Sequence, residues 1–365
     1  MPTTPDRVRE LIQASGLSKH AFALGIGLDA SKLSKSLAGT RRFTSLDLAR
    51  IAEARGVTVD WLITGEEPGL AMAARTSGGS AAAAIREARR LSGLRTDMAF
   101  LGHPQSWHPV TVDQRGRRHA DHGATLAAAA RERLRESGRS STEPDLAGVI
   151  EAVFGADVAV ADLGVNFDGL AVSSDDVKLI LVATSQLPTR QRFTLVHELG
   201  HLLAGDDQEL HVDQNIDSKD ARKDPSELRA NAFAAAFLMP EGALRAAAGS
   251  RGMDETSFAT LAYDLGVSPL ALAYRLQNLR LIDAGTCDRF RAMSATRAAN
   301  LAGHGEDFAR LVLASGSPRP PGPLVRDTYL AYDRGEATLR PYAALIGADV
   351  DALRSALESE ALAPT

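Results

Sequence analysis

The stretch QRFTLVHELGHLLAG, residues 191–205, decides the fold of the central part of this chain. His197 and His201 are four residues apart, so on a helix their imidazoles lie on one face, one turn from each other. At that spacing two imidazole nitrogens can reach a single zinc ion. Glu198 lies about 100° further round the helix, from where its carboxylate can reach a water molecule without binding the metal. We therefore predict a catalytic zinc site on a buried helix.

A catalytic zinc ion takes three protein ligands and one open position, and three residues further along are candidates for the third ligand. Asp207 stands where one class of zinc peptidases has its ligand, but the turn glycine of that class is absent. His211 lies in a polar stretch. Glu227 is the first choice, because it opens the segment ELRANAFAAAFLMP, whose alanines let another helix approach closely. Asn231, one helical turn later, is a candidate partner of the Glu227 carboxylate, and a role in helix packing is the equal alternative.

The residues around this motif predict an α+β domain. Three runs of apolar and β-branched residues, bounded by turn residues, indicate strands at 157–162, 169–173 and 177–184. Helical patterns precede them from residue 126 and follow them to the end of the chain. An order of helices, strands and helices is typical of α+β proteins.

The segment VHELGH, followed by ExxANxFAxxFLMP, resembles the ImmA/IrrE family of zinc metallopeptidases. The RQRFT lead-in, the strands DGLAVS and VKLILVAT, and the later SPLALAYRLQNLRLI also match, so the resemblance covers roughly residues 122–285. It implies a zincin-like domain in which His197, His201 and Glu227 hold Zn²⁺ and Glu198 is the general base of peptide hydrolysis. It also implies a repressor-type protein as the substrate.

This comparison does not identify the residue that stabilises the oxyanion. Four side chains are candidates for that role: Tyr263, Tyr274, His211 and Arg229.

The first 65 residues predict a separate all-α unit of five short helices. Ser18, Asp29 and Ser45 are placed to cap three of them. This part carries nine Lys/Arg against six Asp/Glu, whereas the remaining 300 residues have a net charge of −8. A basic module on an acidic body indicates that any contact with nucleic acid is made by the N-terminal part.

The N-terminal sequence, through to its closing VDWLITG, resembles the Cro/CI-type (XRE) helix-turn-helix domain, which implies a lambda-repressor-like five-helix fold. In that comparison residues 30–37 are the recognition helix, which lies in the major groove of DNA. The implied partner is a double-stranded DNA operator, bound by a homodimer. The residues expected to contact bases or phosphates are Ser31, Lys32, Ser34, Lys35, Arg41 and Arg42.

Together these features predict a multidomain protein: a helix-turn-helix domain at 1–65, an irregular linker at 66–121, the metallopeptidase-like domain at 122–285 and a helical C-terminal region at 286–365. The single cysteine, Cys287, excludes an internal disulfide. The absence of long apolar runs excludes a membrane-spanning helix, and we expect a cytoplasmic protein with no membrane partner.

Two functions from different classes fit these features. In the first, the chain is a DNA-binding transcriptional regulator whose peptidase domain cleaves a repressor. In the second, it is a transcription factor whose zinc domain senses a ligand or holds a partner without proteolysis. A third hypothesis is that the chain is an antitoxin-like autorepressor.

Overall fold

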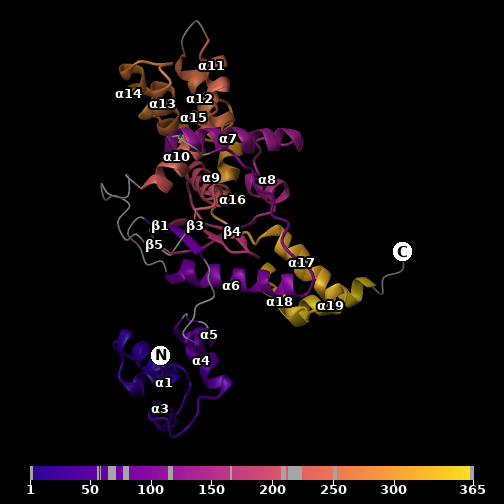
Figure 1. Ribbon diagram of the computed structural model, residues 1–365. Coiled ribbons are helices and arrows are strands. Elements are labelled where there is room, and N and C mark those ends of the chain that lie inside the picture. Colours follow the sequence, from indigo (N-terminus) through magenta and orange to yellow (C-terminus); the bar gives the residue numbers. More distant parts are fainter. Residues whose placement is uncertain are drawn as a thin grey trace. The chain divides into compact units, whose positions relative to one another are not determined.

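The computed structural model describes residues 3–55, 57, 59–64, 71–76, 82–113, 118–164, 167–206, 211–212, 224–249 and 253–361 (Figure 1). The chain divides into two compact units, residues 1–70 (unit 1) and 71–365 (unit 2). None of the described helices is long and apolar enough to cross a bilayer.

Unit 1 contains helices in the five places where the sequence predicts them. They are α1 (Thr4–Ala14), α2 (Lys19–Gly25), α3 (Ala30–Leu37), α4 (Ser45–Arg55) and α5 (Val59–Thr64). Their apolar faces form one core around Val8, Phe22, Leu33, Ile51 and Leu62. Side chains of Ser18 and Asp29 cap α2 and α3 as predicted. The cap of α4 is Thr44 rather than Ser45, because the Thr44 hydroxyl accepts the Asp47 amide.

Unit 2 is built on a five-stranded mixed sheet with the order β2-β4-β3-β1-β5. The strands are β1 (Ala71–Thr76), β2 (Asp157–Ala161), β3 (Phe167–Ser173), β4 (Lys178–Ala183) and β5 (His211–Val212). The three predicted strands are confirmed as β2, β3 and β4; β2 runs parallel to β4, and β3 runs antiparallel to it. β1 and β5 were not predicted.

Helices cover both faces of this sheet. α9 packs on β3 and β4 from one side, while α6 packs on the same two strands from the other (Figure 1). α7 and α10 cover α9 in turn. The bounds of the helices in this part are α6 (Ala82–Phe100), α7 (His119–Glu136), α8 (Leu146–Phe154), α9 (Pro188–Ala204) and α10 (Pro225–Leu238).

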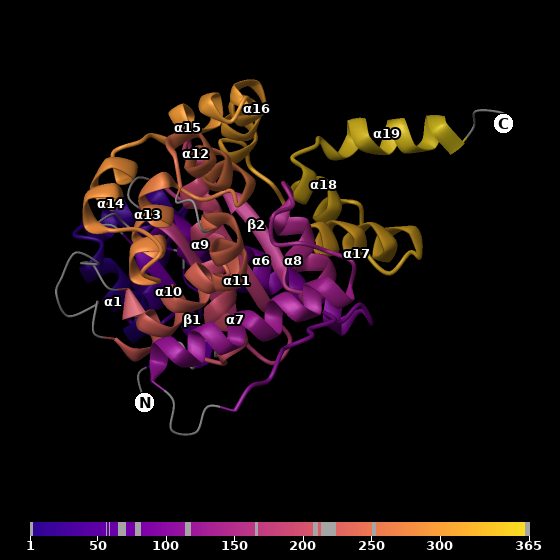
Figure 2. The ribbon, with the colours of Figure 1, turned by 90° about the horizontal axis from the view of Figure 1, so that it is seen from above.

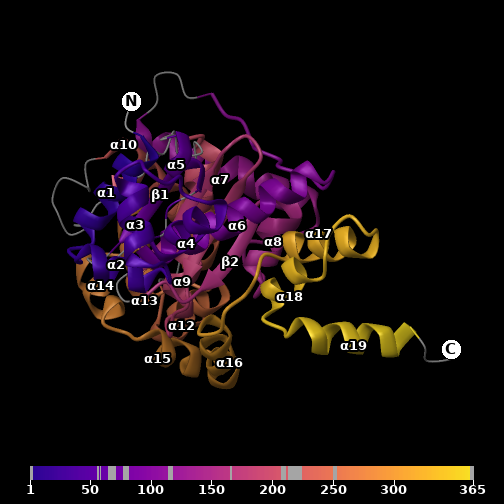
Figure 3. The ribbon, with the colours of Figure 1, turned by 90° about the horizontal axis from the view of Figure 1, so that it is seen from below.

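The chain after α10 is helical, as predicted. These helices are α11 (Glu241–Ala248), α12 (Glu255–Asp264), α13 (Pro269–Asn278), α14 (Ala284–Arg291), α15 (Ala295–Leu301), α16 (Gly305–Ser315), α17 (Gly322–Asp333), α18 (Arg340–Ile346) and α19 (Val350–Ala361). α17 packs on α6, α8 and β2, whereas α19 extends away from the rest of unit 2 (Figures 2 and 3).

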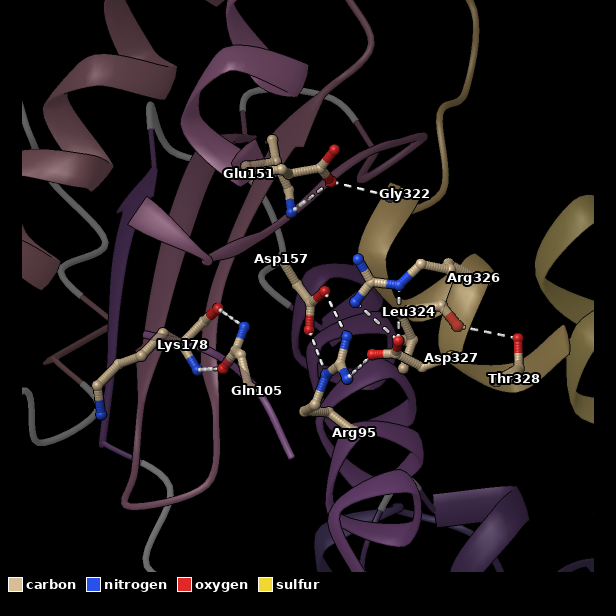
Figure 4. Close-up of polar contacts among 11 residues, drawn as sticks. Arg95, Gln105, Glu151, Asp157, Lys178, Gly322, Leu324, Arg326, Asp327 and Thr328 are labelled. Carbon is tan, nitrogen blue, oxygen red and sulfur yellow. Dashed lines mark hydrogen bonds and ion pairs between the residues drawn. The ribbon is translucent and has the colours of Figure 1, made fainter. Parts of the chain in front are cut away.

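The prediction of an irregular linker over residues 66–121 is wrong for most of its described part. Residues 71–76 form β1, residues 82–100 form α6, and α7 begins at His119. The sequence favours a short helix only over residues 81–93, whereas α6 continues to Phe100. One core position of this continuation is Arg95, which is 1% exposed between Leu91 and Met98. Its guanidinium binds the carboxylates of Asp157 and Asp327 (Figure 4), so a charged residue occupies an apolar position.

At β2, which lies at one edge of the sheet, residues 319–322 are joined to segments far away in sequence. The Arg319 backbone exchanges two hydrogen bonds of 2.8 Å with Val160. Glu151 accepts the Gly322 amide (Figure 4). It also binds the Arg319 guanidinium. The C-terminal helices are therefore fixed to an α+β body, and the chain as a whole is a multidomain α+β protein.

Candidate metal centre

α9 carries the HExxH motif into the interior of unit 2. The helix starts with Pro188 in its first turn and ends at Gly205, whose φ of 65° is the left-handed conformation that glycine adopts easily. Every residue from Thr194 to Leu203 is buried. His197 is 0% exposed and His201 is 2% exposed, so both imidazoles are held in an interior that excludes most water.

α10 brings Glu227 to the two histidines. The Asp224 side chain caps this helix and Pro225 occupies its first position, which places Glu227 in the first turn, where the helix dipole favours a carboxylate. Gly123 of α7 allows the close approach of α10, because a Cβ there would lie 2.3 Å from the Arg229 carbonyl oxygen. Gly200 of α9 similarly packs against the Phe233 ring.

Three donor atoms meet at the junction of the two helices. The Nε2 atoms of His197 and His201 are 3.1 Å apart. The Glu227 carboxylate lies 3.4 Å from His197 Nε2 and 3.2 Å from His201 Nε2. Within the described ranges, these residues form a group able to hold a metal ion.

The donor set fits zinc. Ligand atoms about 2.0–2.1 Å from a tetrahedral zinc ion lie roughly 3.4 Å from one another, and the three separations here are 3.1, 3.2 and 3.4 Å. Two imidazoles and one carboxylate are a known donor set of catalytic zinc. Since the Glu227 side chain is 35% exposed, solvent reaches the group from that side.

Asp206 supports the second histidine, and sequence reasoning missed it. Its Oδ2 lies 2.9 Å from His201 Nδ1, which leaves Nε2 of the same ring to face the metal position. The Arg229 guanidinium binds the other oxygen of Asp206. A carboxylate on the far nitrogen of a ligand histidine fixes its tautomer and raises its basicity. Its place directly after the helix-ending Gly205 was the signal available in the sequence.

Glu198 lies in the same helical turn but outside the three-donor group. It is 1% exposed, and its Cγ would be 3.5 Å from a Cβ added at Gly169 of β3. Its side chain therefore lies where α9 faces the sheet. This position is compatible with a general base that accepts and donates a proton, rather than with a metal ligand.

The electrostatics of the group favour a charged carboxylate. Burial by itself raises the pKa of Glu227, but hydrogen bonds and charge interactions with His197 and His201 outweigh burial and hold that pKa well below its usual range. Glu227 is accordingly ionised near neutral pH, which a metal ligand requires.

Three of the other candidates, Asn231, Tyr263 and Tyr274, make no described contact with this centre. Asn231 is exposed on α10, and no hydrogen bond among the described residues joins it to Glu227. Tyr263 stacks on His304, and the Tyr274 hydroxyl accepts the Arg291 guanidinium. The backbone of His211 forms β5. Asp207 lies outside the described residues.

The residues predicted to contact DNA lie on and after α3. Ser31, Lys32, Ser34 and Lys35 are exposed, whereas Leu33 and Leu37 on the opposite face are buried. Arg42 is exposed. Arg41 is instead held within unit 1 by a 2.7 Å ion pair with Asp47 and a hydrogen bond to Ser36.

Comparison with known proteins is consistent with this geometry. Residues 153–277 match the model of the IrrE N-terminal-like domain. A stretch of 133 residues is 33% identical to the radiation response metalloprotease IrrE of Deinococcus radiodurans, and it covers 36% of this chain and 40% of that protein. The chain thus spans less than half the length of this relative. Residues 153–277 are therefore similar to a metallopeptidase domain, while the helices of unit 1 lie outside the residues that the family model matches.

Proposed function

We propose that unit 2 is a zinc-dependent endopeptidase that cleaves a protein of the repressor type. The observation that carries the proposal is the convergence of His197, His201 and Glu227 at 3.1–3.4 Å beside the buried Glu198. The similarity to the IrrE N-terminal-like domain supports the same chemistry. The substrate class is taken from the family resemblance of the sequence.

In this mechanism His197, His201 and Glu227 hold zinc, and Asp206 keeps the His201 ring oriented through Nδ1. When bound, zinc supplies Lewis acidity that makes a water molecule more acidic and polarises a peptide carbonyl. The Glu198 carboxylate takes the proton from the attacking water on Oε and returns it to the leaving amine. The buried surroundings of Glu198 keep bulk water from competing for that proton.

Glu198→Gln tests this proposal. The variant keeps the shape of the side chain but removes its basicity, so it should bind zinc like the wild type and lose cleavage of unfolded casein by about a hundredfold or more. Undiminished cleavage would remove Glu198 from the mechanism. A wild-type chain that binds zinc but cleaves neither casein nor a repressor would favour the non-proteolytic sensor or the antitoxin-like autorepressor.

We also propose that unit 1 binds double-stranded DNA through α3 as a homodimer. The support is the exposed polar face of Ser31, Lys32, Ser34 and Lys35 on a helix whose other face is buried. Arg42 adds an exposed cation close by in sequence. Arg41 contributes to the same region from a fixed position, because Asp47 holds its guanidinium.

The double variant Lys32→Ala/Lys35→Ala tests the DNA proposal. Binding to a duplex of about 30 base pairs should weaken, and the slope of log K against log salt should become shallower by roughly two. Arg354→Ala, which removes an exposed cation of α19, is the matched control and should change neither quantity. Unchanged binding by the double variant would move the DNA site away from α3.

A further inference from the structure

β1 occupies an unusual place in the sheet. Residues 71–76 pair antiparallel with β3, with Ala71 opposite Ser173 and Arg75 opposite Gly169. On its other side β1 pairs in parallel with β5, through Ala73 and Ala74. β1 thus lies between β3 and β5.

This place is next to the catalytic helix. A Cβ at Gly169 would lie 2.7 Å from Thr194 Cγ2 and 3.5 Å from Glu198 Cγ, so this residue of β3 faces α9 at the general base. Because neighbouring strands are about 4.8 Å apart, the β1 backbone at Arg75 passes one strand spacing from that point. The side of β3 that β1 covers, here called the edge of β3, is therefore where an extended chain would lie beside the candidate centre.

The sequence of β1 predicts a weak strand. AMAART has three alanines and only one β-branched residue, Thr76, so its side chains contribute little β-propensity. Its pairing depends mainly on backbone hydrogen bonds, which any extended peptide can offer. A proline- and glycine-containing segment, EEPG, precedes it, and SGG follows it. A sequence that favours the extended state so weakly allows the strand to leave the sheet.

We propose that the edge of β3 is the substrate-binding edge, and that residues 71–76 occupy it in cis as an inhibitory strand. The proposal rests on the proposed peptidase function, and it adds that the substrate binds as an extended segment antiparallel to β3. A tethered strand has an effective concentration of about millimolar, so a free peptide must bind well to displace it. Unit 1 ends at Leu70, which makes β1 the first element after the N-terminal unit.

A reversible cross-link tests whether β1 blocks the site. Ala71 and Ser173 are directly opposite each other, so Ala71→Cys/Ser173→Cys can form a disulfide that locks β1 onto β3. The native thiol of Cys287 is buried and does not compete. Casein cleavage by the zinc-loaded full chain should fall about tenfold or more on oxidation and recover on reduction with a phosphine, since opening of β1 limits access. The single variant Ser173→Cys is the control. Equal cleavage by the oxidised and reduced forms would overturn the proposal.

A second variant tests the proposal without cleavage. Ala73→Pro removes a strand donor from β1, whereas Gly78→Pro makes the same kind of change outside the strand. Both are placed in the Glu198→Gln chain. In Ala73→Pro, amide exchange at residues 169–173 should accelerate about tenfold while exchange in α9 is unchanged, and a labelled peptide AMAART should bind. Gly78→Pro should show neither effect.

These results separate the two proposals. If no form of the chain cleaves casein but Ala73→Pro opens β3 and binds the peptide, the peptidase function fails and the strand assignment stands. If Ala73→Pro exchanges like the wild type and binds no peptide, the inhibitory strand is overturned whether or not the chain is a peptidase.

Discussion

Replacing Arg95 should strongly destabilise unit 2. Its guanidinium donates to Asp157 at 2.7 and 2.8 Å and to Asp327 at 2.6 Å. The side chains of Arg95 and Asp157 are each 1% exposed, and that of Asp327 is 7% exposed. Arg95→Met fills a similar volume but leaves both carboxylates without this cation.

The magnitude follows from which carboxylate keeps a partner. Asp327 retains Arg326 at 2.8 Å, whereas Asp157 is left deeply buried without its bidentate partner. Removing one member of a buried ion pair costs about 3–5 kcal/mol, and we expect that loss in the free energy of unfolding of unit 2. Replacing both charges with apolar residues, in Arg95→Met/Asp157→Leu, should recover most of it.

The assay is urea unfolding of the full chain, followed by far-UV circular dichroism. Arg95→Met should lower the midpoint of the unit 2 transition and leave that of unit 1 unchanged, and the double variant should restore it. A loss below about 1 kcal/mol in Arg95→Met would refute the reasoning, because a buried pair would then behave like an exposed one. If the double variant is no more stable than Arg95→Met, the loss of stability is not caused by an unpaired Asp157 carboxylate.

Three further predictions concern the metal centre and unit 1. Asp206→Ala should weaken zinc binding about 10–100-fold in a chelator competition, since it frees the His201 ring; equal affinity would contradict the supporting role. Gly123→Ala should cost about 1–3 kcal/mol in urea unfolding, because the new Cβ meets the Arg229 carbonyl; a neutral change would mean that α7 and α10 separate without strain. Burial alone would raise the pKa of Asp47, but its hydrogen bonds and ion pair hold it below 3.8. The charged Asp47 side chain therefore stabilises unit 1 above the pKa of the unfolded chain, and this stabilisation is lost as pH falls through the folded pKa. Asp47→Asn should thus cost about 1–2 kcal/mol at pH 7 and progressively less below pH 4 in thermal unfolding. A cost independent of pH would exclude a role for the charge.

The residues of the candidate centre could be found from the sequence, because local rules place them. The four-residue spacing puts His197 and His201 on one face of α9, and Pro225 starts the helix that carries Glu227. Both rules depend only on neighbours in sequence. The same is true of the three strands β2, β3 and β4, whose runs of apolar residues are continuous.

What could not be predicted depends on contacts between distant residues. Arg95 lies in the core only because Asp157 and Asp327, 62 and 232 residues away, neutralise it. β1 has almost no β-propensity and is a strand because β3 and β5 offer it backbone partners. Asp206 gains its role from the direction in which the chain leaves α9. Cooperation of this kind leaves no periodic pattern in the sequence.

The most direct test of the account is the amount of zinc bound per chain in purified protein, measured beside Glu227→Ala. The geometry of the three donors predicts about one zinc ion per wild-type chain and a large loss of binding in the variant, with both proteins folded. A folded wild-type chain that takes up no zinc from solution, or a Glu227→Ala chain that binds it equally well, would contradict the proposed metal centre and the peptidase chemistry built on it.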